Sequence, residues 1–501
     1  MTCPSVPRPL LACALVVSAT ILGGCFRAAT FKRGAPARAV PADEVIAPVS
    51  ATPGDLAIAD VTVIDVVGGV ARLGQTVVID GDRIAAIGPA GTTLVPAGAA
   101  VIDGKGKFLI PGLWDMHAHI ADPAMPAMFM RYGITGVRHM FSLMPGVTDL
   151  RPPAAKDGTP AGPRVVAAAQ MLDGSGTAFT FPFGTNVIKA DTPEAARAGV
   201  RKLSERGNDF VKVHSALPRG AYFAAVAEAK AVGLPVAGHV PYMVTAAEAS
   251  DAGQLTIEHL DGVAASCSTL ESRCLARLRD FAMAAQPDQH TPWRVECEAL
   301  ETFDSKKADA LFVKFVANGT WHVPTLVQAR GEAQLGDPNA LDPAVEKQLP
   351  GAARAFWKRD FKDGGVTLVL ARRRYTRQDL LDREALFEGE LKLVGRMHAA
   401  GVRLLAGTDT PCPLVVPGLS LHEELEILVR AGLTPADALR AATVNPAQCL
   451  GLTDRCGSVE VGKRADLVLL ARNPLADIRN TRSIDAVLVG GYQVPRSGAD
   501  D

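Results

Sequence analysis

The chain has 501 residues, of which 48% are hydrophobic and 21% are charged, and its formal net charge is -1. This composition is that of an ordinary globular protein, and the length allows a large core and more than one domain. The net charge gives no sign of the basic surface that nucleic acids require, so we expect no nucleic-acid partner.

The first residues have the pattern of a lipoprotein signal peptide. Arg8 precedes an apolar run over 10–22, which is too short to span a bilayer comfortably. The run ends in the letters LGGC, which resemble the bacterial lipobox, where the chain is cut before a cysteine that is then acylated. We therefore expect a signal peptide over 1–24 and a lipid anchor on Cys25, with an ordinary secretory signal as the alternative. Phe26 follows this cysteine rather than Asp, which by analogy indicates an outer-membrane protein that faces the periplasm.

Both ends of the mature chain contain short β-rich segments. Residues 25–52 are rich in Ala, Pro and Arg, and we expect a flexible tether there. Beyond the tether, Asp80-Gly81 separates two β-branched runs in the manner of a hairpin, and a Gly490-Gly491 turn separates two others near the C-terminus. Because each set is too small for a core of its own, we predict that 53–110 and 455–495 form one small β-sandwich domain.

The middle of the chain, 111–454, alternates predicted strands with predicted helices. Eight strands that are each followed by helix are the pattern of a (β/α)8 TIM barrel, so we assign the chain to the α/β class. The predicted strands are Leu113–His119, Gly136–Met140, Arg164–Ala169, Phe210–His214, Pro235–Val240, Thr256–Leu260, His322–Val327 and Arg403–Thr408.

Several helices have recognisable ends. The Ala-rich segment Ala221–Ala231 stops before Gly233, a residue suited to the left-handed position after a helix. Ser420 and Glu423 match a capping box at the start of an amphipathic helix, and Thr434 is followed by a proline that starts another.

Two long connections, 262–318 and 328–398, are expected to carry further helices that cover the barrel mouth. The second contains Arg372-Arg373-Arg374, which we predict to be a solvated helix face, with contact to a substrate carboxylate as the alternative.

Cysteines outside the signal and the anchor allow disulfides in an exported protein. Cys267 and Cys274 have the same spacing as Cys449 and Cys456, and each pair is a candidate among many pairings. No C-x-x-C motif is present, which argues against a cysteine zinc site.

Ligand-type residues stand near the ends of several predicted strands. His117 and His119 are two apart in a predicted strand, so they share a face and could bind one metal ion. Taken alone, this spacing also fits two unrelated polar residues. The further candidates are Lys212, His214, His239, His259 and Asp409. Because active sites of such barrels lie at the C-terminal strand ends, we expect these side chains to converge.

Together, the segments GKFLIPGLWDMHAH, VKVHS, GHVPY, IEHLDG, LAGTDT and GSVEVGKRADLVLL resemble the amidohydrolase superfamily, in its imidazolonepropionase-like and prolidase-like branch. The resemblance covers about 55–495 and implies a barrel beside a β-sandwich. It implies a first metal ion on His117, His119 and Asp409, and a second on His239 and His259.

The resemblance also implies that Lys212 is carbamylated and bridges the two ions. A free ammonium group beside two dications is disfavoured, so this lysine should be neutral and nucleophilic. A lysine that merely neighbours a one-metal site is the alternative. Two zinc ions are the expected cofactors, and manganese, iron or cobalt would also fit.

The implied mechanism is hydrolysis. Metal ions lower the pKa of bound water and polarise a carbonyl, and Asp409 would take the proton and pass it to the leaving group. Tyr242 could donate to the oxyanion, although prolidase-like relatives carry their tyrosine one position earlier, and packing at the rim is the alternative. His214 would line either the site or the core. Superfamily deaminases carry His-x-x-Glu where this chain has Tyr242, which disfavours ring deamination.

We therefore expect a metal-dependent enzyme that cleaves an amide bond of a small molecule, with dipeptides and N-acyl amino acids as the leading substrates. The alternatives are an esterase or lactonase, a one-metal enzyme that opens a cyclic amide, and a non-catalytic lipoprotein that binds a ligand. A homo-oligomer is compatible with the sequence.

Overall fold

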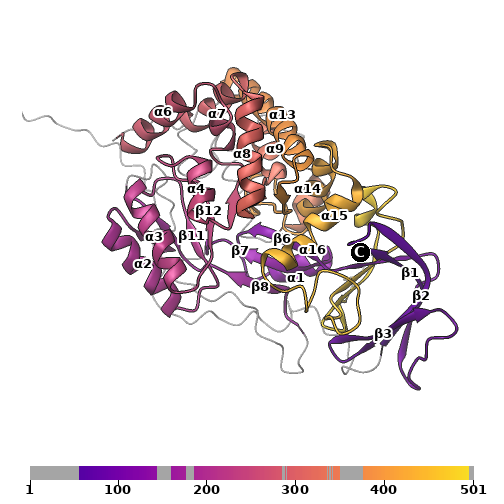
Figure 1. Ribbon diagram of the computed structural model, residues 1–501. Coiled ribbons are helices and arrows are strands. Elements are labelled where there is room, and N and C mark those ends of the chain that lie inside the picture. Colours follow the sequence, from indigo (N-terminus) through magenta and orange to yellow (C-terminus); the bar gives the residue numbers. More distant parts are fainter. Residues whose placement is uncertain are drawn as a thin grey trace, which may run out of the picture. The chain divides into compact units, whose positions relative to one another are not determined.

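The computed structural model describes residues 56–143, 160–175, 186–284, 288, 290–335, 337, 340, 342–349 and 376–495 (Figure 1). These residues all belong to one compact unit. The predicted signal peptide, the tether, Cys25 and Arg372-Arg373-Arg374 lie outside the described residues. None of the helices in the described ranges combines the length and the apolar character needed to cross a membrane.

Strands from both chain ends form one eight-stranded sheet, in the order β18-β17-β16-β5-β1-β2-β3, with β4 also paired to β1. The antiparallel pairing of β16 with β5 joins the two ends, and one apolar cluster is shared between them. The prediction that the two chain ends share one β-sheet is therefore confirmed. The strands of this sheet are β1 (Leu56–Asp65), β2 (Val70–Asp80), β3 (Arg83–Pro89), β4 (Ala100–Asp103), β5 (Phe108–Pro111), β16 (Leu467–Leu470), β17 (Ile484–Val489) and β18 (Tyr492–Gln493).

The two predicted turns of this domain are present. Asp80 pairs with Arg83 across the β2–β3 hairpin. Gly490 and Gly491 have φ angles of 55° and 80° and connect β17 to β18, and successive positive φ values explain why two glycines stand there.

The middle of the chain forms a parallel barrel, as predicted. Its strands fall into a three-stranded sheet, β6-β7-β8, and a seven-stranded sheet, β10-β9-β11-β12-β13-β14-β15. Backbone hydrogen bonds join the two sheets on both sides, from Met116 N to Ala406 O at 2.9 Å and from Asp209 N to Ala167 O at 2.9 Å. The strands are β6 (Leu113–Ala118), β7 (Ile134–His139), β8 (Arg164–Ala167), β9 (Met171–Asp173), β10 (Val187–Lys189), β11 (Val211–Val213), β12 (Val236–Gly238), β13 (Thr256–Glu258), β14 (Trp321–Val323) and β15 (Arg403–Leu404).

Helices surround the barrel, and both long connections carry extra ones, as expected. α13 packs against α7 and α9, which places both insertions on the same side of the molecule (Figure 1). The helices are α1 (Met125–Arg131), α2 (Pro193–Glu205), α3 (Arg219–Ala231), α4 (Ala246–Ala252), α5 (Val263–Ser266), α6 (Glu271–Met283), α7 (Thr291–Glu301), α8 (Ser305–Asn318), α9 (Leu326–Ala333), α10 (Pro343–Gln348), α13 (Arg377–Ala399), α14 (Leu419–Arg430), α15 (Pro435–Ala441) and α16 (Val444–Cys449), with the 3-10 helix η2 (Ile478–Arg482).

Several local predictions were wrong. The strand predicted to reach Val327 ends at Val323, and α9 begins at Leu326. The capping box at Ser420 does not form, because α14 begins two residues earlier than predicted, at Leu419, and Gly418 is its N-cap. The Ser420 hydroxyl instead accepts a hydrogen bond from Val416 N at 2.9 Å. The short strands β9 and β10 were not predicted.

The suggested disulfides are not formed. The six cysteines within the described ranges are all free thiols, Cys267, Cys274, Cys297, Cys412, Cys449 and Cys456.

Candidate metal centre

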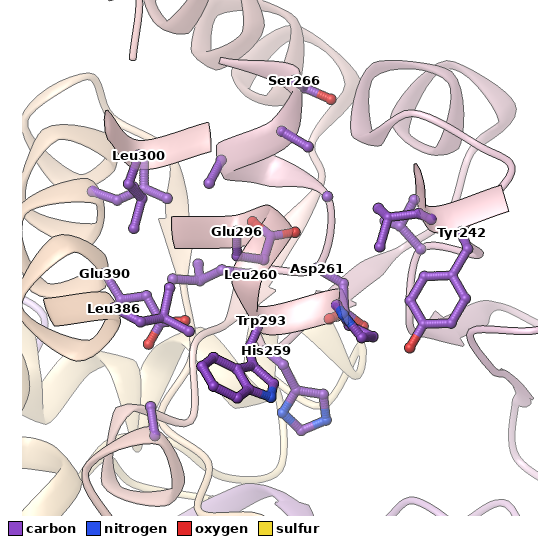
Figure 2. A pocket seen from close by; sticks show the side chains of 18 of the residues that line it. Tyr242, His259, Leu260, Asp261, Ser266, Trp293, Glu296, Leu300, Leu386 and Glu390 are labelled. Atoms are coloured by element: carbon purple, nitrogen blue, oxygen red, sulfur yellow. The ribbon is translucent and has the colours of Figure 1, made fainter. Parts of the chain in front are cut away.

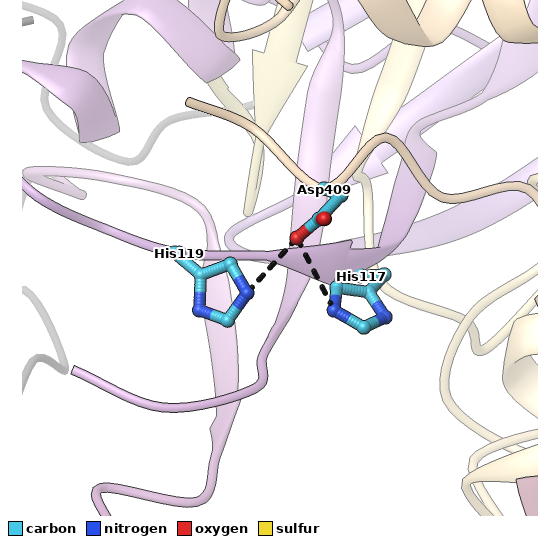
Figure 3. A group of neighbouring side chains, drawn as sticks. All are labelled: His117, His119 and Asp409. Atoms are coloured by element: carbon cyan, nitrogen blue, oxygen red, sulfur yellow. Dashed lines mark ion pairs between the residues drawn. The ribbon is translucent and has the colours of Figure 1, made fainter. Parts of the chain in front are cut away.

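Three side chains from opposite ends of the barrel sequence meet in a buried group. His117 lies in β6, His119 directly follows that strand, and Asp409 lies on the segment after β15 (Figure 3). The Nε2 atoms of His117 and His119 lie 3.4 Å and 3.0 Å from the same oxygen, Oδ1 of Asp409. Ligand atoms of all three residues lie within 4.8 Å of one another, the spacing expected around one metal ion.

The chain around Asp409 is held against β6 by close packing. A Cβ atom at Gly407 would lie 2.8 Å from His117 N, so only glycine allows this approach. Buried Asp115 accepts hydrogen bonds from Thr408 Oγ1 at 2.6 Å and from Thr408 N at 3.0 Å, which fixes the segment that carries Asp409. Burial raises the pKa of Asp115 to about 7.

The other predicted ligands surround this group. The ring centroid of His259 lies 4.5 Å from that of His117 and 4.9 Å from that of His239. Lys212, in β11, is only 1% exposed. A Cβ atom at Gly238 would lie 2.2 Å from Val213 O, so only glycine allows β12 to pack this closely against the strand that carries Lys212. The three other residues that the resemblance implies as metal ligands thus lie beside the group of three.

Each of the four histidines uses Nδ1 for a hydrogen bond to an oxygen atom. This arrangement orients the rings and leaves Nε2 available to a ligand, as is usual for metal-binding histidines. The pairs are His117 with Glu258 Oε2 at 2.8 Å, His119 with Phe141 O at 3.0 Å, His239 with Ser215 Oγ at 2.6 Å and His259 with Thr325 Oγ1 at 2.8 Å.

Electrostatics favours neutral imidazoles at His117, His239 and His259 and an ionised carboxylate at Asp409. Burial, together with the charge of Lys212, holds the pKa of His117 and of His239 well below its usual value, and burial lowers the pKa of His259 to about 4. Burial alone would raise the pKa of Asp409, but contact with His119 and the nearby positive charges outweigh it and lower the pKa to about 2. Burial also lowers the pKa of Lys212 to about 8.

This donor set fits a divalent cation. The carboxylate of Glu258 accepts the Nδ1 proton of neutral His117, so the Nε2 lone pair of that ring faces the Asp409 carboxylate. His117 Nε2 is buried and has no hydrogen-bond partner among the described residues. A lone pair and an anionic oxygen that converge in a buried site require a positive charge between them.

The residues behind the ligands were not predicted. Glu258 is fully buried and accepts hydrogen bonds from Arg138 Nη2 at 2.8 Å and 2.9 Å, while Arg138 Nε donates to Met116 O at 2.6 Å. The signal was present in the sequence, because a charged residue inside an apolar strand needs a buried partner.

Backbone strain is concentrated at the same site. His259, Leu260, Thr325 and Asp409 have φ angles of 56°, 58°, 48° and 59°, in the left-handed region that residues other than glycine seldom adopt. Such conformations persist where the surrounding structure enforces them and are frequent at functional sites.

The two remaining predicted residues lie at the edge of the centre. His214 Nδ1 lies 3.0 Å from Asp173 Oδ2, and its ring centroid is 4.2 Å from that of His239. The ring of Tyr242 packs edge-on against Phe281, with centroids 5.4 Å apart. Tyr242 and His259 also line the same cavity (Figure 2). Tyr242 therefore packs at the rim and also faces a space that a ligand could enter.

Comparisons with known proteins agree with this geometry. The model of the amidohydrolase family matches residues 108–494. A dihydroorotase from Pelotomaculum thermopropionicum is 26% identical over 431 residues, which cover 82% of this chain and 87% of that protein. An imidazolonepropionase from Rubrobacter xylanophilus is 26% identical over 422 residues, which cover 79% and 84%.

A solved Xaa-Pro dipeptidase with bound methionine resembles the fold with a TM-score of 0.60 and 20% identity, covering 88% of this chain and 99% of that one. The match of the family model over most of the chain, the two full-length relatives and the His-His-Asp group lead to one conclusion. The chain belongs to the amidohydrolase family and is a hydrolase that acts on carbon–nitrogen bonds.

Proposed function

We propose that this protein is a binuclear metal-dependent amidohydrolase that cleaves the amide bond of a small dipeptide-like or N-acyl amino acid substrate. The observation that carries the proposal is the buried group of His117, His119 and Asp409, in which an unpartnered imidazole nitrogen faces a carboxylate. The likeness to a dipeptidase supports a peptide-like substrate.

Two ions would share the centre. His117, His119 and Asp409 would hold the first, and His239 and His259 would hold the second. Divalent metal ions supply Lewis acidity, which acidifies water and polarises a carbonyl group. Zinc is the proposed ion, because its usual ligands are imidazole nitrogens and carboxylate oxygens.

Lys212 would bridge the two ions as a carbamate. Its lowered pKa increases the fraction of neutral amine, the form that adds carbon dioxide and releases a proton. The product is an anionic oxygen ligand where a free ammonium group would repel both ions.

Asp409 and Tyr242 would act on the substrate itself. Asp409 is ionised and lies at the centre, so its Oδ2 atom, which accepts a hydrogen bond from Cys412 Sγ at 3.3 Å, can also take a proton from the attacking water and deliver it to the leaving nitrogen. Tyr242 lines the cavity beside His259, where its phenol can donate to the carbonyl oxygen as negative charge develops. His214 would support the position of His239.

A second candidate is a one-ion enzyme that opens a cyclic amide. Among the described residues, His117, His119 and Asp409 form the only group of three or more His, Cys, Asp or Glu ligands. The likeness to an imidazolonepropionase also favours this reading.

A panel of substrates tests the proposal. The purified protein would be assayed with dipeptides, N-acyl amino acids, a cyclic amide and aryl esters, before and after treatment with a chelator. We expect amide hydrolysis that the chelator abolishes and added zinc restores. Ester turnover without amide turnover would contradict the proposal, and hydrolysis of the cyclic amide alone would favour the second candidate.

A further inference from the structure

A cavity of about 270 Å³ adjoins the metal centre (Figure 2). His259 and Tyr242 belong to its lining, so the cavity begins where the proposed reaction takes place. Helices α7 and α13, from the two insertions, form its other side. Much of the wall is aliphatic, with Leu260, Leu278, Leu300, Leu386 and Leu393. Such a space accepts one small substituent of a substrate.

Acidic residues outnumber basic ones in this lining. Five carboxyl residues accompany a single guanidinium, that of Arg383. Glu271 forms an ion pair with Lys307 at 2.6 Å, and Arg383 pairs with Glu332. Two of the remaining acids, Glu296 on α7 and Glu390 on α13, have no basic ion-pair partner among the described residues. We call the cavity that Asp261, Glu296 and Glu390 line the acidic cavity.

Two buried polar atoms in the cavity lining lack hydrogen-bond partners among the described residues, and a bound ligand could supply them. Glu390 Oε2 and Trp293 Nε1 are buried atoms that lack a hydrogen-bond partner within the described part of the chain. Trp293 is only 8% exposed and lines the cavity together with His259 (Figure 2). Buried polar groups are nearly always paired, so an unpaired acceptor and an unpaired donor in one cavity indicate a polar ligand.

The charge state of the two acids supports a cationic ligand. Burial raises the pKa of Glu296 to about 7, and burial and the neighbouring Glu296 raise the pKa of Glu390 well above its usual value. Both shifts express the cost of a buried negative charge that lacks a counter-ion. An entering cation removes that cost, whereas an entering anion increases it.

We propose that the acidic cavity binds the cationic end of the substrate, an ammonium or guanidinium group on an aliphatic stem attached to one side of the scissile amide. Glu296 and Glu390 then determine specificity. The leucine walls accommodate the stem, just as apolar surfaces in proteins commonly cover the aliphatic stems of lysine and arginine. Trp293 Nε1 is free to donate a hydrogen bond to an oxygen of the same substrate. This substrate class rests on the proposed amide hydrolysis.

Matched peptides provide the test. Citrulline has nearly the shape of arginine but carries no charge, so we would compare alanyl-arginine with alanyl-citrulline, and arginyl-alanine with citrullinyl-alanine. We expect the wild-type protein to prefer the charged member of at least one pair by about tenfold or more in kcat/KM. The double variant Glu296→Gln, Glu390→Gln should lose this preference and retain turnover of the citrulline peptide.

Glu298→Gln is the matched control, because Glu298 lies on the same helix but pairs with Arg277 outside the cavity. Thermal unfolding of each variant checks that it is folded, and the wild-type comparison stands without any variant. Equal turnover within both pairs, or a preference that survives in the double variant, would overturn the inference while leaving amide hydrolysis intact. No hydrolysis of any amide would overturn the proposed function, and this inference with it.

Discussion

The metal centre and the acidic cavity adjoin at His259, but their buried polar groups are stabilised to different extents by hydrogen bonds within the protein. At the metal centre, hydrogen bonds to Nδ1 orient every proposed histidine ligand before any cation arrives. In the acidic cavity, Glu390 Oε2 has no hydrogen bond to any described residue, and the pKa values of Glu296 and Glu390 are raised.

The difference indicates two kinds of ligand. Rigid, pre-oriented donors suit a small metal ion that demands fixed geometry. Carboxyl groups that can take up or release a proton suit an organic cation that comes and goes with the substrate. The three predictions that follow test each half of this contrast, beginning with the largest effect.

Asp409→Asn should lower kcat/KM by about 10²- to 10⁴-fold, because an amide of the same size cannot accept the proton from water. Steady-state kinetics on an active dipeptide measures this effect. Metal content would be determined in parallel, so that loss of proton transfer is separated from loss of the ion. Activity within tenfold of wild type would contradict the role of Asp409.

Glu258→Gln should weaken metal binding by about 10- to 100-fold, because the amide no longer accepts the Nδ1 proton of His117 as a charged partner. Competition with a chromogenic chelator measures the affinity. Glu248→Gln is the control, since Glu248 pairs with exposed Arg219 away from the site. Unchanged affinity in Glu258→Gln would show that the orientation of His117 does not depend on this carboxylate.

Glu296→Gln should change stability in a pH-dependent way. The folded state binds the Glu296 proton more tightly than the unfolded chain, since burial raises the pKa from 4.5 to about 7. The wild-type free energy of unfolding should therefore lose a contribution as the pH rises from about 4.5 through about 7, and the variant should not. Denaturant titrations of both proteins at several pH values test this. If the free energies of unfolding of the two proteins change in parallel with pH, Glu296 is not a buried carboxyl group that lacks a counter-ion.

The metal centre was predictable because its residues follow strands. Once His117 and His119 are placed two apart on a strand, their shared direction is fixed, and parallel strands bring His239, His259 and Asp409 to the same end of the barrel. Local patterns at strand and helix ends were less reliable. The Ser420 capping box failed because α14 begins at Leu419, directly after Gly418, where a Cβ atom would lie 2.7 Å from Tyr132.

The acidic cavity could not be predicted from the sequence. Glu296 lies on an amphipathic helix in which Glu298, two residues on, forms an ordinary ion pair, and nothing in their spacing says which carboxyl group is buried. Only the packing of α13 against α7 brings Glu390 and Glu296 into one cavity. The contact between the two insertions leaves no periodic pattern in the sequence, whereas the strands that precede the metal ligands do.

Metal content per chain tests the central claim most directly. The protein would be purified without chelator and with bicarbonate present, and its metals would be counted by elemental mass spectrometry for the wild type and for Lys212→Ala. The account predicts two divalent ions per chain in the wild type and fewer in the variant. A single ion that Lys212→Ala leaves in place would contradict the bridged centre and make the one-ion cyclic-amide hydrolase the better description.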